Sequence, residues 1–211
     1  MLPYLPSQSR SRWHLGAIPP LVVVLGVVAG CGGGPAEDGI ARPPGQQAAP
    51  AACPDPAAGR GAGANLPDLT LPCLGRPGAL DLRQLPATPV VLNLWASWCG
   101  PCRKEMPALQ RVHRAAGSRV LFLGIATRDG EGSARGFVDD FGVTYPSLYD
   151  QPGAALGRLG APGLPLTLVL GPDGAVLHRT VGGITQDKLV DVLERAGVRL
   201  DRTVLGEPAG R

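Results

Sequence analysis

The chain has 211 residues and a formal net charge of +3 at pH 7, with 31 glycines and 23 prolines. This length is enough for one domain with a complete hydrophobic core and additional segments. Because the charge is small and scattered along the chain, the composition does not favour nucleic acid as a partner. Glycine and proline are concentrated near the N-terminus, which separates that part of the chain from the remainder.

The first thirty residues have the form of a secretory signal. Arg10 and Arg12 precede an apolar run over residues 15–29, and the run ends in the letters VAGC at Cys31. This ending resembles a bacterial lipobox, which implies cleavage before Cys31 and lipid attachment to its thiol. The alternative is an uncleaved membrane helix, but the run contains prolines and is shorter than the roughly 20 residues needed to span a bilayer. We therefore predict a lipoprotein signal over residues 1–30 and a location outside the cytoplasm, anchored to the membrane.

Residues 31–64 are mostly Gly, Ala, Pro and Gln. Such a composition buries too little apolar surface to fold alone. The sequence therefore predicts a flexible tether over 31–64, whose first twenty residues would have a root-mean-square reach of roughly 25 Å.

Residues 65–196 are predicted to form one domain in which strands and helices alternate. Residues 66–71 and 79–82 form an N-terminal hairpin, and the apolar run 89–96 is a buried strand. A helix over about 101–116 and a second buried strand over 119–126 follow. The later predicted elements are a helix and strand within 131–150, a short helix near 153–159, a hairpin of strands at 166–170 and 175–181, and a last helix over 186–195. Residues 197–211 are predicted to be a tail with no assigned role.

Two cysteines, Cys99 and Cys102, stand where the buried strand meets the first long helix. The spacing brings the two sulfurs within one helical turn, close enough to form a disulfide. The unpaired N–H groups and positive dipole end of a helix stabilise a thiolate on the first sulfur. We therefore assign Cys99 as the exposed nucleophile and Cys102 as the more buried resolving thiol. The competing interpretation, half of a zinc site, needs a second ligand pair with suitable spacing, which Cys53 and Cys73 do not provide.

Cys53 and Cys73 remain once the lipid and redox cysteines are assigned. Outside the cytoplasm a remaining pair is usually a disulfide, so we predict a structural bridge that fixes the end of the tether to the domain. A second redox pair is the alternative, although neither cysteine stands at a helix start.

The run over residues 92–107, LNLWASWCGPCRKEMP, resembles the active site of thioredoxin-fold proteins. It is similar more narrowly to the extracytoplasmic TlpA/ResA/CcmG branch, and the resemblance covers about 65–196. It implies an α/β thioredoxin fold: a mixed central sheet flanked by helices, with an N-terminal β-hairpin and a central helix-strand insert. Proline at position 107, inside the helix, fits this family.

The resemblance also implies roles for residues near the thiols. Pro165 matches the family's cis-proline, which would place the Leu164 backbone opposite Cys99 for pairing with an extended substrate. Glu105 matches a glutamate that lies in the active-site cleft of ResA-like proteins and tunes the thiols; the alternative is a solvated helix carboxylate. Asn93 stands where thioredoxin has a buried aspartate, so Glu105 or water would have to accept the Cys102 proton.

Three further residues are predicted to form the substrate-facing surface. Trp98 is expected to shield the disulfide and offer an apolar docking surface. Gly100 and Pro101, between the cysteines, favour a thioredoxin-like, reducing potential.

The family implies reduction of protein disulfides, with the Cys-x-x-Cys-His thiols of apocytochrome c as a possible target and a membrane electron donor as a partner. The oxidant interpretation, which introduces disulfides into secreted proteins, stays open because 30 mV of potential corresponds to only about 1.4 kcal/mol. A Cu(I) chaperone is the alternative from another class, since two thiolates can bind Cu(I). We predict a monomer with no cofactor and no resident metal.

Overall fold

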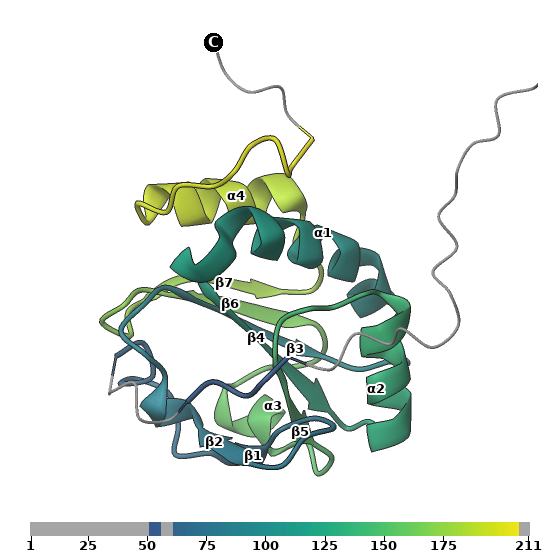
Figure 1. The fold of residues 1–211 in the computed structure, drawn as a ribbon. Helices are drawn as coiled ribbons and strands as arrows, with labels where there is room; N and C mark the ends of the chain where they lie inside the picture. Colours follow the sequence, from purple (N-terminus) through teal and green to yellow (C-terminus); the bar gives the residue numbers. More distant parts are fainter. Residues whose placement is uncertain (1–50, 56–60, 207–211) are drawn as a thin grey trace, which may run out of the picture. The chain divides into compact units, whose positions relative to one another are not determined.

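The computed structural model describes residues 51–55 and 61–206 (Figure 1). The predicted signal, Cys31 and most of the predicted tether lie outside the described residues. The described residues fall within one compact unit. Among them, no helix combines the length and the apolar character that crossing a membrane requires.

A five-stranded mixed sheet forms the centre of the domain, in the order β5-β4-β3-β6-β7. β3 lies parallel to β4 and β4 parallel to β5, whereas β3–β6 and β6–β7 are antiparallel. Strands β1 and β2 form a separate antiparallel hairpin. The elements in chain order are β1 (Thr70–Pro72), β2 (Ala79–Asp81), the 3-10 turn η2 (Leu82–Gln84), β3 (Val90–Trp95), α1 (Gly100–Ala116), the 3-10 turn η3 (Gly117–Arg119), β4 (Leu121–Thr127), α2 (Glu131–Asp140), β5 (Ser147–Asp150), α3 (Ala154–Arg158), β6 (Leu166–Leu170), β7 (Val176–Val181) and α4 (Gln186–Arg195).

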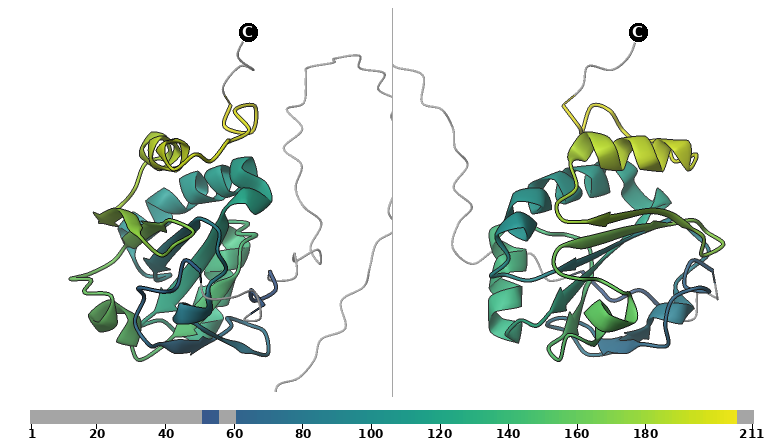
Figure 2. Two further views of the ribbon diagram at one scale, coloured as in Figure 1. Left: turned by 90° about the vertical axis from the view of Figure 1, so that its left-hand side faces the viewer. Right: turned by 180° about the vertical axis from the view of Figure 1, so that it is seen from behind.

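Helices α1, α2 and α4 cover one face of the sheet, and α3 with the β1–β2 hairpin covers the other (Figures 1 and 2). Strand β3 shows why: Val91 and Trp95 belong to the core under α1, while Leu92 and Leu94 belong to the core over the hairpin. Both faces of β3 are therefore buried, which favours a run of apolar residues rather than alternation; Asn93 is the one polar residue in this run. The predicted thioredoxin-type fold, its helix-strand insert (α2 and β5) and its late hairpin (β6 and β7) are confirmed.

The folded domain begins earlier than the predicted boundary at residue 65. Ala62 is fully buried, and its N–H donates to the carbonyl of Pro86. Gly61 and Gly63 allow this packing, because a Cβ on either residue would collide with the backbone of residues 82–87. A glycine-rich composition is typical of a linker, but here it permits close backbone contact. The first strand is shorter than the predicted strand over residues 66–71. The Leu66 N–H donates to the Gly63 carbonyl and closes a turn, so Leu66 does not extend β1.

The predicted C-terminal tail is also packed on the domain as far as residue 206. Val198 and Leu205 are buried, and the Asp201 N–H donates to the Ala115 carbonyl at the end of α1. These residues extend the core between α1 and α4.

Candidate active site

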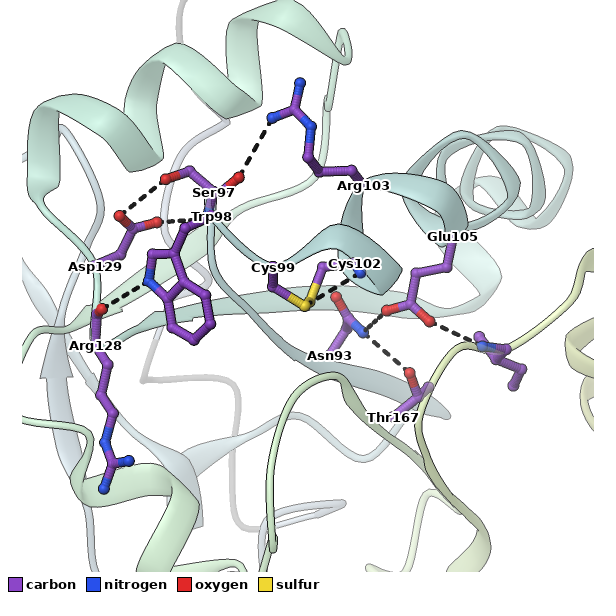
Figure 3. The surroundings of a disulfide bond; sticks show 11 residues. Asn93, Ser97, Trp98, Cys99, Cys102, Arg103, Glu105, Arg128, Asp129 and Thr167 are labelled. Carbon is purple, nitrogen blue, oxygen red and sulfur yellow. Dashed lines mark hydrogen bonds between the residues drawn. A yellow bond between two sulfur atoms is a disulfide. The ribbon is translucent and has the colours of Figure 1, made fainter.

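Cys99 and Cys102 form a disulfide at the N-terminus of α1, with their Cα atoms 5.3 Å apart (Figure 3). Cys99 is the N-cap residue of the helix: its backbone is extended, and its Sγ accepts the Cys102 N–H at 3.2 Å. Pro101 occupies the first turn, where its missing N–H would have had no helical acceptor. Gly100 and Pro101 are thus the first two residues of α1, directly after the N-cap Cys99. The backbone donors at this end favour negative charge on Cys99 once the pair is reduced.

Both cysteines are buried when they are joined in the disulfide. Cys102 is fully inaccessible, and Cys99 is 4 % exposed. The predicted order of exposure is correct, but the description of Cys99 as exposed is wrong for this redox state. The reason is geometric, because the bond to Cys102 and the N–H contact direct the Cys99 sulfur toward the helix.

Glu105 lies one turn after Cys102, and its carboxylate is enclosed by three segments. Its Oε1 accepts the Asn93 Nδ2–H at 2.9 Å, and its Oε2 accepts the Ile184 N–H at 2.8 Å. Asn93 Nδ2 also donates to Thr167 Oγ1 at 3.0 Å. Glu105 is only 4 % exposed, so it is not a solvated helix carboxylate. Figure 3 shows this group of side chains on the Cys102 side of the disulfide.

Burial raises the pKa of Glu105 to about 7, against a smaller opposing effect of the hydrogen bonds from Ile184 and Asn93. A carboxyl group with this pKa can accept and return a proton near neutral pH. The amide of Asn93 cannot accept and return a proton near neutral pH. Its Oδ1 is buried and has no hydrogen-bond partner among the described residues. Glu105 is therefore a buried group, one helical turn after Cys102, that can exchange a proton near neutral pH.

The raised pKa of Glu105 predicts that the protein loses stability as the pH rises. The folded protein holds the Glu105 proton more tightly than the unfolded chain, whose ordinary value is 4.5. The contribution of Glu105 to stability is thus complete below pH 4.5 and is lost once the pH passes about 7, a loss of about 3 kcal/mol. Urea unfolding of the oxidised protein at pH 4 and pH 8 measures this, with Glu105→Gln as reference. An equal pH dependence in both proteins would contradict the assignment.

A cavity of about 300 Å³ lies beside this carboxylate, between the first two turns of α1 and the loop before α4. Its lining is mainly apolar, with Glu105 and Lys104 as the charged members; the other residues are Pro101, Ala108, Gly183, Ile184 and Thr185. The cavity reaches Pro101, which stands between Gly100 and Cys102.

Pro165 and Leu164 lie at the same end of the sheet as the cysteines. In the antiparallel register, Leu166 pairs with Leu94 near the end of β3, so the residues before β6 lie beside the β3–α1 turn. The Leu164–Pro165 peptide bond is cis. Pro165 is buried, and Leu164 is half-buried against both cores.

Trp98 is 62 % exposed, whereas the neighbouring Trp95 is fully buried. The Trp98 Nε1–H donates to the Arg128 carbonyl at 3.0 Å. Ser97, the residue before it, is held by the Asp129 carboxylate. No local pattern in the sequence marks Arg128 or Asp129, because their link to the site arises only when β4 lies beside β3.

Cys53 is joined to Cys73, with a Cα–Cα distance of 6.1 Å and a separation of 20 positions along the chain. Cys73 is buried and forms an isolated backbone β-bridge with Leu148 of β5. The disulfide therefore fixes the 51–55 segment to the sheet. This is the pairing that the cysteine count predicts. Its structural role is a proposal.

We predict that Cys53→Ser/Cys73→Ser loses about 3 kcal/mol of unfolding free energy, because opening a loop of this size releases entropy in the unfolded chain. Denaturant unfolding without reductant measures the loss. Unchanged stability combined with a loss of exchange activity would instead identify a second redox pair.

Within residues 51–55 and 61–206, no three His, Cys, Asp or Glu residues are grouped as a metal site would need. The two cysteines and the Glu105 carboxyl group are the reactive groups that the contacts described above bring together. Together they can exchange disulfides and move the accompanying proton.

Comparison with known proteins agrees with this chemistry. Residues 61–195 match the Redoxin family model. The chain is 26% identical over 117 residues to thiol-disulfide oxidoreductase ResA of Bacillus thuringiensis, covering 55% of this chain and 68% of that protein. It is 32% identical over 105 residues to thiol:disulfide interchange protein HelX of Rhodobacter capsulatus, covering 49% and 58%.

Solved structures show the same relationship. A secreted disulfide oxidoreductase of Mycobacterium tuberculosis, homologous to DsbE of E. coli, superposes with a TM-score of 0.56 at 28% identity, covering 61% of this chain and 96% of that one. A DsbF homologue from Corynebacterium diphtheriae gives a TM-score of 0.57 at 33% identity, covering 62% and 85%. The chain therefore belongs to the Redoxin family and is a thiol-disulfide oxidoreductase of the ResA/CcmG/DsbE type.

Proposed function

We propose that this redoxin works outside the cytoplasm, anchored to the membrane through a lipid on Cys31, and reduces disulfides in other proteins. The observation that carries the redox assignment is the pairing of Cys99 and Cys102 at the start of α1, with a buried carboxyl group one turn away. Location outside the cytoplasm is supported by the signal-like N-terminus and by the relatives described as secreted.

The reaction begins when the Cys99 thiolate attacks one sulfur of the target disulfide. A bond forms between Cys99 and that sulfur, and the second target sulfur leaves as a thiolate that takes a proton. Cys102 then loses its proton to Glu105 and attacks the Cys99 sulfur, which releases the first target sulfur as a thiolate that is protonated in turn. Two electrons have moved from the Cys99–Cys102 pair to the target, and a membrane electron donor returns the pair to the dithiol.

The buried carboxyl group supports the reducing direction. Once ionised, Glu105 repels a thiolate on the nearby cysteine pair, which destabilises the reduced form relative to the disulfide. A less stable reduced form corresponds to a lower potential, and therefore to a better electron donor. The family resemblance supports the thiols of apocytochrome c, oxidised to a disulfide, as one target, which would place the protein in cytochrome c maturation.

The direction of electron flow is tested by the reduction potential of the Cys99–Cys102 pair together with its redox state in living cells, trapped with acid and alkylated. A potential near that of thioredoxin, about −270 mV, and a pair held mainly as dithiol support the reductant. A potential near that of DsbA, about −120 mV, and a pair held mainly as disulfide would show that the protein is an oxidant of secreted proteins.

A further inference from the structure

We propose that Asp129 is a positioning residue for disulfide exchange: it fixes the Ser97–Trp98 segment and so holds the Trp98 indole as a preformed contact for polypeptide substrates. The proposal needs only thiol-disulfide exchange, in either direction of electron flow. It begins from the loop between β4 and α2, which Figure 3 shows beside the segment that leads into Cys99.

The Asp129 carboxylate is 5 % exposed and accepts three hydrogen bonds. Its Oδ2 accepts the Ser97 N–H at 2.5 Å, and its Oδ1 accepts the Ser97 O–H and the Gly130 N–H, both at 2.9 Å. Its own carbonyl accepts the Tyr149 O–H at 3.1 Å. Asp129 thus ties Ser97 to a loop that β5 holds in place.

The indole of Trp98 is held by the neighbouring residue of the same loop. Its Nε1–H donates to the Arg128 carbonyl at 3.0 Å, and Figure 3 shows the ring between Arg128 and Cys99. Arg128 has a φ of +52°, which makes it the one residue other than glycine with a positive φ in the described part of the chain. Such a backbone persists only where its surroundings hold it. Here the Arg128 N–H donates to the Asp150 carbonyl at 3.0 Å.

A third contact holds the segment from the side of the helix. Arg103 of α1 donates from its guanidinium to the Ser97 carbonyl at 3.3 Å. The same guanidinium lies over the rings of Phe137 and Phe141, 5.6 and 5.1 Å from their centroids. The N–H, hydroxyl and carbonyl of Ser97 and the indole N–H of Trp98 are therefore all bound by groups outside that segment.

An indole that is 62 % exposed gains little from burial in this protein. Its fixed position next to the nucleophile is instead suited to contact with a partner, since tryptophan is enriched among the residues that contribute most to protein binding. Fixing it in advance removes the cost of ordering the side chain when the substrate binds. The alternative is that Asp129 only maintains the fold, and the two ideas differ in which kinetic constant changes.

The test replaces Asp129 by Asn in the full chain. In either orientation of the new amide, its NH₂ group would face the N–H of Ser97 or of Gly130. At least one of the hydrogen bonds that the Asp129 carboxylate accepts is therefore lost. We expect the KM for insulin disulfides to rise about tenfold while kcat changes less than threefold. We also expect the ratio of the rates with insulin and with oxidised glutathione to fall about tenfold. The ¹H–¹⁵N resonance of the Trp98 indole, assigned with Trp98→Phe, should move toward the position of a solvated indole.

Asp140→Asn removes the same charge from an exposed position on α2 and should leave all three measurements unchanged. Ser97→Ala removes one of the Asp129 contacts and serves if Asp129→Asn does not fold. It should raise the KM in the same direction by a smaller factor. An unchanged KM, an equal loss with insulin and glutathione, or an unmoved indole resonance would overturn the proposal. None of these results depends on whether the protein is a reductant or an oxidant.

Discussion

Cys102→Ser is expected to lower the turnover rate at least about 1000-fold and to leave the protein joined to its target through a disulfide with Cys99. The first attack needs only the Cys99 thiolate, which the start of α1 stabilises. The second step needs the Cys102 sulfur, which the structure places within bonding reach of Cys99. Without it, the intermolecular disulfide has no resolving partner and accumulates.

Electrophoresis without reductant and mass spectrometry of the linked peptide measure this adduct. Cys99→Ser should lose the same activity without forming an adduct, while Cys53→Ser/Cys73→Ser should retain both turnover and normal resolution. Adducts joined through Cys102 in the Cys99→Ser protein would reverse the assigned roles of the two cysteines.

Glu105→Gln is expected to slow the resolving step by about 100-fold at pH 7, because proton transfer to a positioned side chain typically contributes 10²–10⁴-fold. In the wild-type protein the rate should rise with pH up to the Glu105 pKa of about 7, since only the ionised carboxylate accepts the Cys102 proton. The variant should lack this inflection. Its side chain can still be accommodated if the Asn93 amide rotates and turns its unpartnered Oδ1 toward the new NH₂ group.

The measurement is single-turnover release of a small thiol from its mixed disulfide with Cys99, followed across a pH series. Glu131→Gln, which changes an exposed carboxylate on α2, is the matched control and should behave as wild type. Glu105→Asp keeps the charge on a shorter side chain and should retain part of the pH step. A wild-type profile without an inflection near 7 would show that water or another group accepts the proton.

The order of strands and helices could be predicted from the sequence because both faces of the sheet are covered. Burial on two sides favours the largely apolar run of β3, in which Asn93 is the one polar residue, and the change from that run to helix-forming residues after Pro101 is local. The ends of the domain could not be predicted in this way. Gly61 and Gly63 lie in a stretch whose composition is typical of a linker. Only the folded structure shows that a side chain on either glycine would collide with the backbone of residues 82–87.

In the candidate site, too, features set by neighbouring residues could be predicted, whereas features that depend on residues distant in the chain could not. The spacing of Cys99, Cys102 and Glu105 along one helix is visible in the sequence. The burial of Glu105 is not, because it depends on the Ile184 N–H, which is 79 residues away along the chain. Asp129 was missed for a similar reason, since its contacts with Ser97 cross 32 residues and no local pattern marks them.

The proposed reaction depends on the amide groups at the start of α1, which acidify the Cys99 sulfur and leave Cys102 to resolve the mixed disulfide. The most direct test is the rate of iodoacetamide alkylation of Cys99 in reduced Cys102→Ser protein across a pH series. We expect a midpoint clearly below the ordinary thiol pKa of about 8.5. A midpoint at or above that value, with disulfide exchange no faster than that of free cysteine, would contradict it.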